Sequence, residues 1–477
     1  MSKSNRMELA EKMGSNYTIS NGIMGEMSSR LQILDCENGK STTKPHKKQY
    51  DRTGQEQSAH GHIQPDHPTS YLETFMHLLR GNIGVGVFGM GDAFKNGGIF
   101  LGPIMTCIIG LVSVHCQHVL MTCSKNMHLI QSNANEKDAN MESPDFAETV
   151  ELCFIHGPPK AKKYSRFMKF LVNFFICLTQ LGFCCVYFVF IDKNLEQFWN
   201  HFIDYKYNHY VKFTLILLPI MLLSMITNLK YLAPASTIAN ISMATSMVLT
   251  FYFLFQDLPP ITERRAFGNL QDLPLFFGTA IFAFEGIALV LPLKNAMKKP
   301  KLFSRPVGVL NVGMVMIASL FVAIGFVGYW RYGENIEATV TMNLPKDSPL
   351  AQVIKLMVSL GILLSYPLQL FVAVQIMWSA IEDRHGPLKH PHQTQLLISV
   401  VPALNSFISL IGALCSSGLA LIFPPIIQMV AAYGTAEGPS RWIWVKNSFI
   451  MCIALIGLFT GTYESIQSLI KAFYAVH

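Results

Sequence analysis

The chain contains a long series of apolar runs that are almost free of charge. A membrane-spanning helix needs about 20 predominantly apolar residues to cross the hydrocarbon core of a bilayer. The sequence therefore predicts an all-α, polytopic membrane protein, with the lipid bilayer as its main partner. The runs lie at roughly 72–95, 98–122, 166–191, 210–228, 233–256, 274–293, 306–330, 351–380, 396–432 and 446–468.

The composition supports this class of protein. Hydrophobic residues make up 51% of the chain and charged residues only 14%, whereas a soluble domain has about 25% charged residues. The formal net charge of +7 is compatible with binding to nucleic acid. The basic residues, however, form short clusters beside the apolar runs, where they act as orientation signals. We therefore expect no nucleic-acid partner.

The polar N-terminal segment sets the domain boundary. Residues 1–68 lack apolar helical periodicity, which predicts a disordered cytosolic tail before a transmembrane domain at residues 69–477. Basic clusters at 160–166 and 294–305 are both cytosolic if the N-terminus is cytosolic, so they agree on one orientation. The histidines of the tail lack cysteine or acidic partners at ligand spacing, so we expect no metal and no cofactor.

The first run is a poor helix by its own composition. Gly81, Gly84, Gly86, Gly89 and Gly91 interrupt it every two or three residues. In a bilayer, a broken helix is tolerated only where its freed backbone groups are buried in protein or line a cavity. Unwinding here would present amide groups at the start of a half-helix to a substrate carboxylate. The alternative is close helix packing through a face of small residues.

The sixth run contains a second candidate break. It holds Gly278, Gly286 and Pro292 together with Glu285, its one acidic residue. A carboxylate inside a membrane is costly and is by default a functional candidate, here for proton coupling or gating. A structural glutamate bonded to a neighbouring helix is the alternative. Discontinuous helices in corresponding places of two halves are typical of inverted-repeat transporters.

Three further polar residues lie inside apolar runs. His77 precedes the glycine run by one turn, and an interior imidazole can carry a coupling proton near neutral pH. Gln180 and Tyr187 are seven residues apart in the third run, share a helix face and could contact a ligand. A satisfied buried histidine and ordinary core packing are the respective alternatives.

Several strings carry a family resemblance: HLLRGNIGVG, FKNGG, GPIMTCIIGLVSVHC, TQLGFCCVYFVF, PLFFGTAIFAFEGI, TMNLP, FPP and GTYES. Together they resemble the proton-assisted (proton-coupled) amino acid transporter family, within the amino acid and auxin permease superfamily. The resemblance extends from about residue 68 to the C-terminus. It implies eleven spans in a five-plus-five inverted repeat like the leucine-transporter fold.

The resemblance also implies the site. His77 matches the histidine that such transporters use in proton coupling, and Glu285 belongs to the sixth-run segment that the family uses at its substrate site. Substrate backbone groups would be held by the unwound stretch Gly81, Asn82, Ile83, Gly84 and Gly86, and by Phe282, Phe284 and Gly286 of the sixth run. The substrates would be small neutral amino acids such as glycine, alanine or proline, moving with protons across the plasma membrane or a lysosomal or endosomal membrane.

The ninth span departs from the family pattern. The family has a full helix where this chain has the segment 395–404, QLLISVVPAL, which as a helix rises about 15 Å, half of a hydrocarbon core about 30 Å thick. A re-entrant segment would keep Arg441 and Lys446 cytosolic and place the C-terminus on the opposite side. A single crossing of 396–432 would instead put the C-terminus in the cytosol.

Two function classes follow from these features. The first is a secondary active transporter of small neutral amino acids, working by proton symport. The second is an amino acid sensor at an organelle membrane with little flux. A channel is disfavoured because the sequence has no filter-like repeat. No nucleophile and base pair or metal cluster shares a polar site, so we expect no enzyme.

Overall fold

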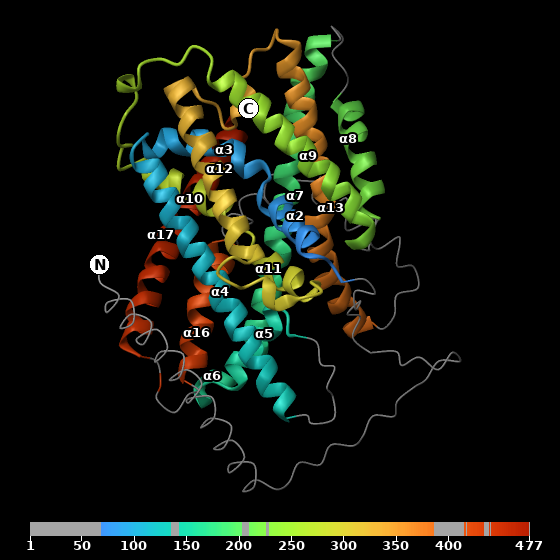
Figure 1. Cartoon of the computed structure of the whole chain (residues 1–477), viewed down its shortest axis with the longest axis vertical. Coiled ribbons are helices and arrows are strands. Elements are labelled where there is room, and N and C mark those ends of the chain that lie inside the picture. The colour runs from blue at the N-terminus through green and yellow to red at the C-terminus, as the bar shows by residue number, and fades with distance from the viewer. Residues whose placement is uncertain are drawn as a thin grey trace, which may run out of the picture.

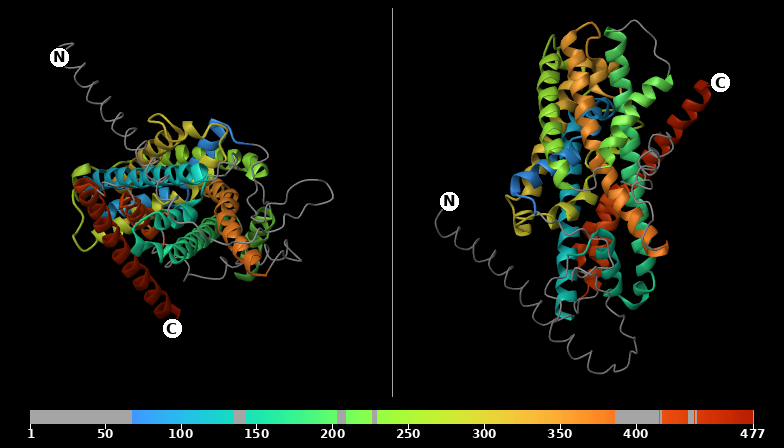
Figure 2. Two further views of the ribbon diagram at one scale, coloured as in Figure 1. Left: turned by 90° about the horizontal axis from the view of Figure 1, so that it is seen from below. Right: turned by 90° about the vertical axis from the view of Figure 1, so that its right-hand side faces the viewer.

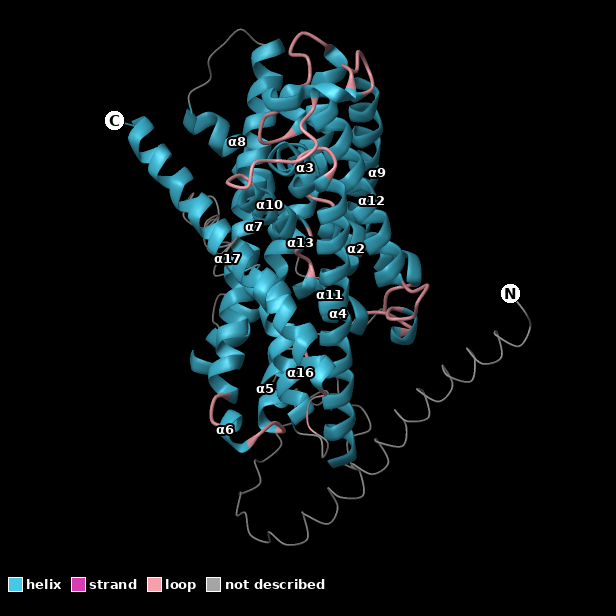
Figure 3. Ribbon diagram, turned by 90° about the vertical axis from the view of Figure 1, so that its left-hand side faces the viewer, coloured by secondary structure: helices cyan, strands magenta, loops and turns pink. Residues whose placement is uncertain are grey.

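The computed structural model describes residues 68–134, 143–202, 209–225, 229–385, 417–433 and 440–476, together with Cys415 and Gly438. The expected tail at 1–68 therefore lies outside the described residues, apart from Pro68. So does the shortened ninth span at 395–404. Regular structure in the described ranges is helical throughout (Figure 3), and the one strand-like contact is an isolated bridge between Thr69 and Met297.

Seven described segments are long and apolar enough to cross a membrane, judged by length and composition. The fold is thus the all-α, polytopic fold that the sequence predicts. These segments lie in α4 (Leu101–Ala134), α7 (Ser165–Phe202), α9 (Leu229–Leu254), the pair α10 (Leu273–Ala283) and α11 (Ile287–Asn295), α12 (Val309–Tyr332), α13 (Pro349–His385) and α17 (Arg441–Val476).

Shorter helices complete the described bundle. The first apolar run is divided into α2 (Tyr71–Asn82) and α3 (Val85–Gly97). Two short apolar segments, Thr214–Ser224 and Gly418–Tyr433, lie in the remaining helices of the bundle. Those helices are α8 (His209–Ser224), a π-helical turn (Gly418–Ile422) and α16 (Phe423–Tyr433). Two further short helices connect α4 to α7, namely α5 (Phe146–Ile155) and α6 (Pro159–Lys162).

The start of α2 is fixed by a capping box. The Ser70 hydroxyl accepts a hydrogen bond from the Glu73 N–H, and the Ser70 N–H donates to the Glu73 carboxylate at 2.7 Å. Such reciprocal bonds satisfy donors that a helix start leaves free. Backbone bonds then tie Thr69 to the end of α11, with the Thr69 N–H donating to the Ala296 carbonyl at 2.8 Å. Backbone hydrogen bonds therefore join the start of α2 to the end of α11.

The long helices stand side by side, with α17 at the periphery of the bundle (Figures 1 and 2). In Figure 1, α4 descends from the upper end to the lower end, whereas α17 begins in the lower half beside α16 and rises toward the C-terminus. Lys446 bonds Gln428 of α16 at 2.8 Å. The start of α17 thus lies beside α16, in the half of the bundle that also holds α6.

A structured loop closes the opposite end of the bundle. The segment 255–272 between α9 and α10 bonds the end of α3, with the Ile99 N–H donating to the Arg265 carbonyl at 2.9 Å. It also bonds the end of α12, where the Arg264 side chain donates to the Trp330 carbonyl at 2.8 Å. Gly98 turns the chain here with φ of 85°, in the left-handed region that favours glycine.

Candidate functional site

The first and sixth spans are both interrupted, and their interruptions face each other. The first break separates α2 from α3 at Ile83 and Gly84, and the second separates α10 from α11 at residues 284–286. A Cβ atom added to Gly86 would lie 2.9 Å from the Ala283 Cα. The backbones of the two spans therefore meet at the breaks, and small residues permit this approach. Both discontinuities that the sequence predicts are confirmed.

A small enclosed cavity lies between the breaks. The cavity has room for about one water molecule. The centre of a water-sized sphere can occupy about 10 Å³ of it. The space between the breaks therefore does not hold a ligand larger than water unless the lining residues move apart. Its lining residues are Gly81, Asn82, Gly84, Val85, Gly86, Phe183, Tyr187, Phe282, Ala283 and Glu285.

Glu285 is the acidic group of the cavity. Its residue is 3% exposed, and neither carboxylate oxygen has a hydrogen-bond partner among the described residues. A buried carboxylate without a partner is costly in a membrane. The cavity thus holds an acceptor that remains available to a proton or to the ammonium group of a ligand. Asn82 contributes a second unpartnered acceptor, its Oδ1, within the described part of the chain.

The lining of the cavity also includes backbone donors. Helix α3 starts at Val85, and the first N–H groups of any α-helix have no acceptor within the helix. The helix dipole adds partial positive charge at the same place. A carboxylate that enters beside Gly84 and Val85 would meet these donors, and Glu285 belongs to the same lining. The cavity is therefore bipolar, like a zwitterionic amino acid.

Tyr187 and Gln369 hold the first break in place. The Gln369 amide of α13 donates to the Gly81 carbonyl at 3.2 Å and to the Tyr187 hydroxyl at 3.4 Å. The hydroxyl also fills the space beside Gly84, because a Cβ atom there would lie 2.5 Å from it. Side chains from the third and eighth spans thus fix the backbone that the cavity exposes.

Two phenylalanines narrow the cavity. The rings of Phe183 in α7 and Phe282 in α10 lie 4.9 Å apart between centroids, and Phe183 also faces Tyr187 at 6.5 Å. Paired aromatic rings at this spacing make a favourable contact. They leave little space for a ligand side chain between them.

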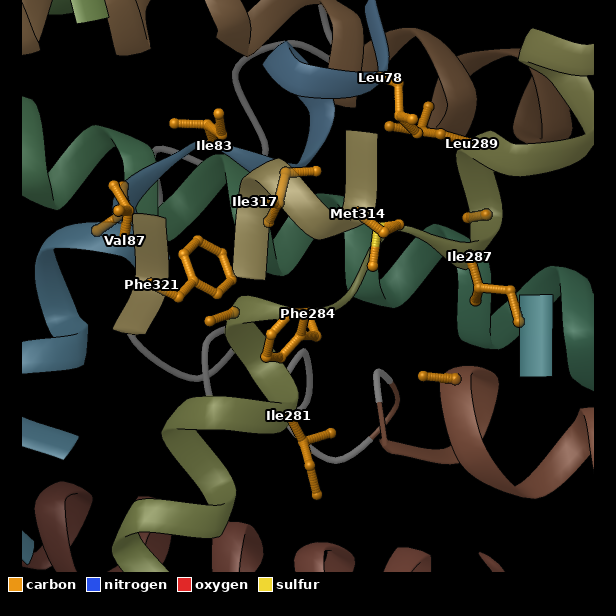
Figure 4. Packing of buried hydrophobic residues seen from close by; sticks show 14 of the residues in the cluster. Leu78, Ile83, Val87, Ile281, Phe284, Ile287, Leu289, Met314, Ile317 and Phe321 are labelled. Carbon is orange, nitrogen blue, oxygen red and sulfur yellow. The ribbon is translucent and has the colours of Figure 1, made fainter. Parts of the chain in front are cut away.

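Four of the predicted site residues lie beside the cavity rather than in its lining. Phe284 points away from it, toward Phe321 of α12, with ring centroids 4.9 Å apart (Figure 4). A Cβ atom on Gly286 would lie 3.0 Å from the Asn82 Cγ, so this glycine serves close packing. Ile83 is buried within the first break, and Gln180 is buried on α7, with its Oε1 unpartnered in the described structure.

His77 lies in α2, outside the cavity lining. It is buried, and its Nδ1 lies 3.3 Å from the hydroxyl of Ser236 in α9. Asn240, one turn further along α9, donates to the Met76 carbonyl at 3.0 Å. His77 therefore marks the interface between the first and fifth spans rather than the substrate position.

Sequence reasoning missed three residues here: Arg80, Phe183 and Gln369. Phe183 and Gln369 sit in apolar runs, where a phenylalanine or a lone glutamine is as typical of core packing as of a site. Arg80 is only 1% exposed and donates to Ser236 through Nη1, although an arginine near a span end usually reaches the interface. Its position beside His77 and the glycine run was the one available signal.

Comparison with known proteins identifies the family. A family model described as "Transmembrane amino acid transporter protein" matches residues 67–469. The chain belongs to this family. A relative from Drosophila melanogaster, "Proton-coupled amino acid transporter-like protein pathetic", is 34% identical over 417 residues, which cover 85% of this chain and 87% of the relative. The resemblance seen in the sequence is thus confirmed.

Two more distant matches concern a second relative and the fold. "Vacuolar amino acid transporter 4" from Saccharomyces cerevisiae is 27% identical, and the alignment covers 84% of this chain and 58% of that relative. A crystal structure of the Eremococcus coleocola manganese transporter has a TM-score of 0.54 at 12% identity, covering 87% of this chain and 92% of that chain. At this identity the likeness concerns the fold alone, an inverted-repeat transporter fold of the kind expected.

Proposed function

We propose that this member of the transmembrane amino acid transporter family is a secondary active transporter that carries small neutral amino acids of the glycine, alanine and proline type in symport with protons. The observation that carries the proposal is the bipolar cavity between the two helix breaks. Its lining combines the free N–H groups that begin α3 with the unpartnered carboxylate of Glu285. An α-amino acid has complementary charges at its two ends.

Substrate size follows from the aromatic pair. The substrate carboxylate would bind at Gly84 and Gly86, and its ammonium group would face Glu285. Its side chain would then point toward Phe183 and Phe282, whose rings are 4.9 Å apart. Hydrogen, methyl and small cyclic side chains need the least displacement of these rings, which supports the substrate class.

Proton coupling would use His77 and Glu285. Glu285 can bind a proton within the cavity, because no described group competes for its oxygens. His77 lies at the contact of α2 with α9, a surface that must separate if α2 moves to open the site. An imidazole titrates near neutral pH and so responds to a physiological proton gradient.

The membrane and the orientation are part of this proposal. The basic clusters at 160–166 and 294–305 would both be cytosolic by the positive-inside rule. The N-terminus would then be cytosolic and the C-terminus external or lumenal. The plasma membrane and a lysosomal or endosomal membrane are the candidate locations. The name of the yeast relative places that protein at a vacuole.

Uptake of labelled alanine into vesicles that contain the purified protein tests the proposal. We expect uptake to rise when the external pH falls and to exceed equilibrium under an inward proton gradient. His77→Ala should abolish the acid stimulation, whereas His156→Ala should keep it, because His156 is exposed on a connecting segment. Alanine binding without flux would favour a sensor, and a flat response across pH would reject proton coupling.

A further inference from the structure

A buried arginine shares a hydrogen-bonding partner with His77. Arg80 follows His77 by three residues in α2, so both side chains lie on one face of the helix. The Arg80 Nη1 donates to the Ser236 hydroxyl of α9, and the same oxygen lies 3.3 Å from the His77 Nδ1. One hydroxyl of the fifth span thus joins two residues of the first half-helix.

The hydrogen bonds at Ser236 indicate which protonation state of His77 fits the contact. A guanidinium group only donates, so the Ser236 oxygen must accept from Arg80. The serine O–H can then donate to Nδ1 of His77, provided that Nδ1 carries no proton. The neutral imidazole would hold its proton on Nε2. The closed contact between α2 and α9 is therefore suited to a neutral His77.

Protonation of Nδ1 changes this balance. The Ser236 oxygen could accept from both donors, but two cations would then lie one turn apart on α2, away from water. The charged groups acting on His77 are Arg80 and, near the exposed start of the helix, Glu73, which Lys298 faces in turn. Glu73 is engaged in the capping box, so it gives little relief to a second cation near Ser236.

The other helices against α2 supply no closer charge among the described residues. Helix α12 presents Gly313 to Leu78, α11 presents Leu289 to Gly81, and α13 presents the neutral amide of Gln369. Arg80 itself retains two unpartnered nitrogens, Nε and Nη2, within the described structure. The arginine is thus a fixed cation whose charge the surrounding helices leave uncompensated.

We propose that Arg80 is a positioning residue that makes protonation of His77 depend on separation of α2 from α9. While the helices are docked, Arg80 and Ser236 keep the imidazole neutral. When α2 moves away, His77 leaves the shared hydroxyl and accepts a proton. The inference rests on the proposed proton coupling through His77, and it adds the reason why a proton would bind in only one of two conformations.

The first test compares variants of Arg80 in the alanine uptake assay between pH 5 and pH 8. Arg80→Gln removes the charge, so His77 becomes protonated while α2 is docked, and the pH of half-maximal uptake should rise by about one unit. Arg80→Lys keeps the charge and should keep the parent profile. His77→Ala combined with Arg80→Gln should be as flat as His77→Ala alone. A purely structural role would lower the maximal rate without moving the midpoint.

The second test does not require Arg80 to be changed. In Asn240→Cys, whose side chain faces Met76 of α2, a small membrane-permeant thiol reagent should label the new cysteine faster at pH 5.5, relative to pH 7.5, than the loss of thiolate alone predicts, with the parent chain as background. Adding His77→Ala should remove that difference. Labelling that falls with pH only as the thiolate fraction does would overturn the inference, as would an unmoved Arg80→Gln profile in a protein whose uptake is acid-stimulated. A parent protein without acid stimulation would instead overturn the proposed function, and this inference with it.

Discussion

Replacing Gly84 by alanine tests whether the first break is a binding site or only a packing surface. An ideal Cβ atom at this position would lie 2.5 Å from the Tyr187 hydroxyl oxygen and 3.2 Å from its Cζ. The phenol must therefore move outward until the first distance exceeds 3.0 Å, which real Cβ contacts respect. Gln369 already bonds the hydroxyl at 3.4 Å, so this displacement breaks the bond that holds Tyr187 at the cavity.

The size of the effect follows from the cost of overpacking. Added methyl groups in a packed interior cost about 1–3 kcal/mol. If only the conformation with Tyr187 in place binds substrate, the apparent affinity for alanine should fall by about 5- to 150-fold, since about 1.4 kcal/mol corresponds to a factor of ten. The amount of protein in the membrane should remain close to that of the parent.

The assay is concentration-dependent uptake of labelled alanine in vesicles, with Gly89→Ala as the matched control. A Cβ atom on Gly89 of α3 would be 3.7 Å from the nearest atom, which is ordinary contact, so this variant should keep the parent affinity. Tyr187→Phe removes the colliding oxygen, and the double variant should lose less affinity than the two single variants together. Parent affinity in Gly84→Ala, or strict additivity of the pair, would refute the reasoning.

Three further outcomes are expected. Glu285→Gln should lose uptake driven by a proton gradient and should also weaken alanine exchange, because an amide carries neither the proton nor the negative charge that would face the ammonium group; comparing both fluxes in the same vesicles checks this, and intact gradient-driven uptake contradicts it. Phe183→Ala should raise leucine uptake relative to alanine by about tenfold, a change typical of added apolar space in a pocket, whereas an unchanged ratio would place Phe183 outside the side-chain site. An epitope after His477 should be reached from the external or lumenal face without permeabilisation, and a cytosolic epitope would invert the direction of α17.

The two helix breaks were predictable because their cause is local. Glycines that recur every two or three residues near Gly84 weaken a helix at whatever place it packs, and the break at residues 83–84 falls within the predicted stretch. Glu285 stood out because an acidic residue inside an apolar run is costly unless it has a use. Neither argument required knowledge of the neighbouring helices.

The direction of each side chain at the breaks was not predictable. Phe282 and Phe284 look equivalent in the sequence, yet Phe282 lines the cavity and Phe284 packs on Phe321. Where the chain leaves helical geometry, the periodicity that assigns residues to faces is lost. Gln180 and Tyr187 share a helix face by spacing, but only Tyr187 reaches the cavity.

The sequence by itself determined that the protein spans a bilayer, that it is helical and to which family it belongs. It also determined where two spans break. Each of these results depends on composition or on a contiguous string of residues. Tertiary structure alone decided which residues meet. Arg80, His77 and Ser236 come together from positions 156 and 159 residues apart, and Phe183 reaches Phe282 from a third helix. The physical reason is that a bilayer specifies length and polarity along the chain, whereas contacts between spans depend on how each helix is rotated and how closely its small residues let it approach its neighbours.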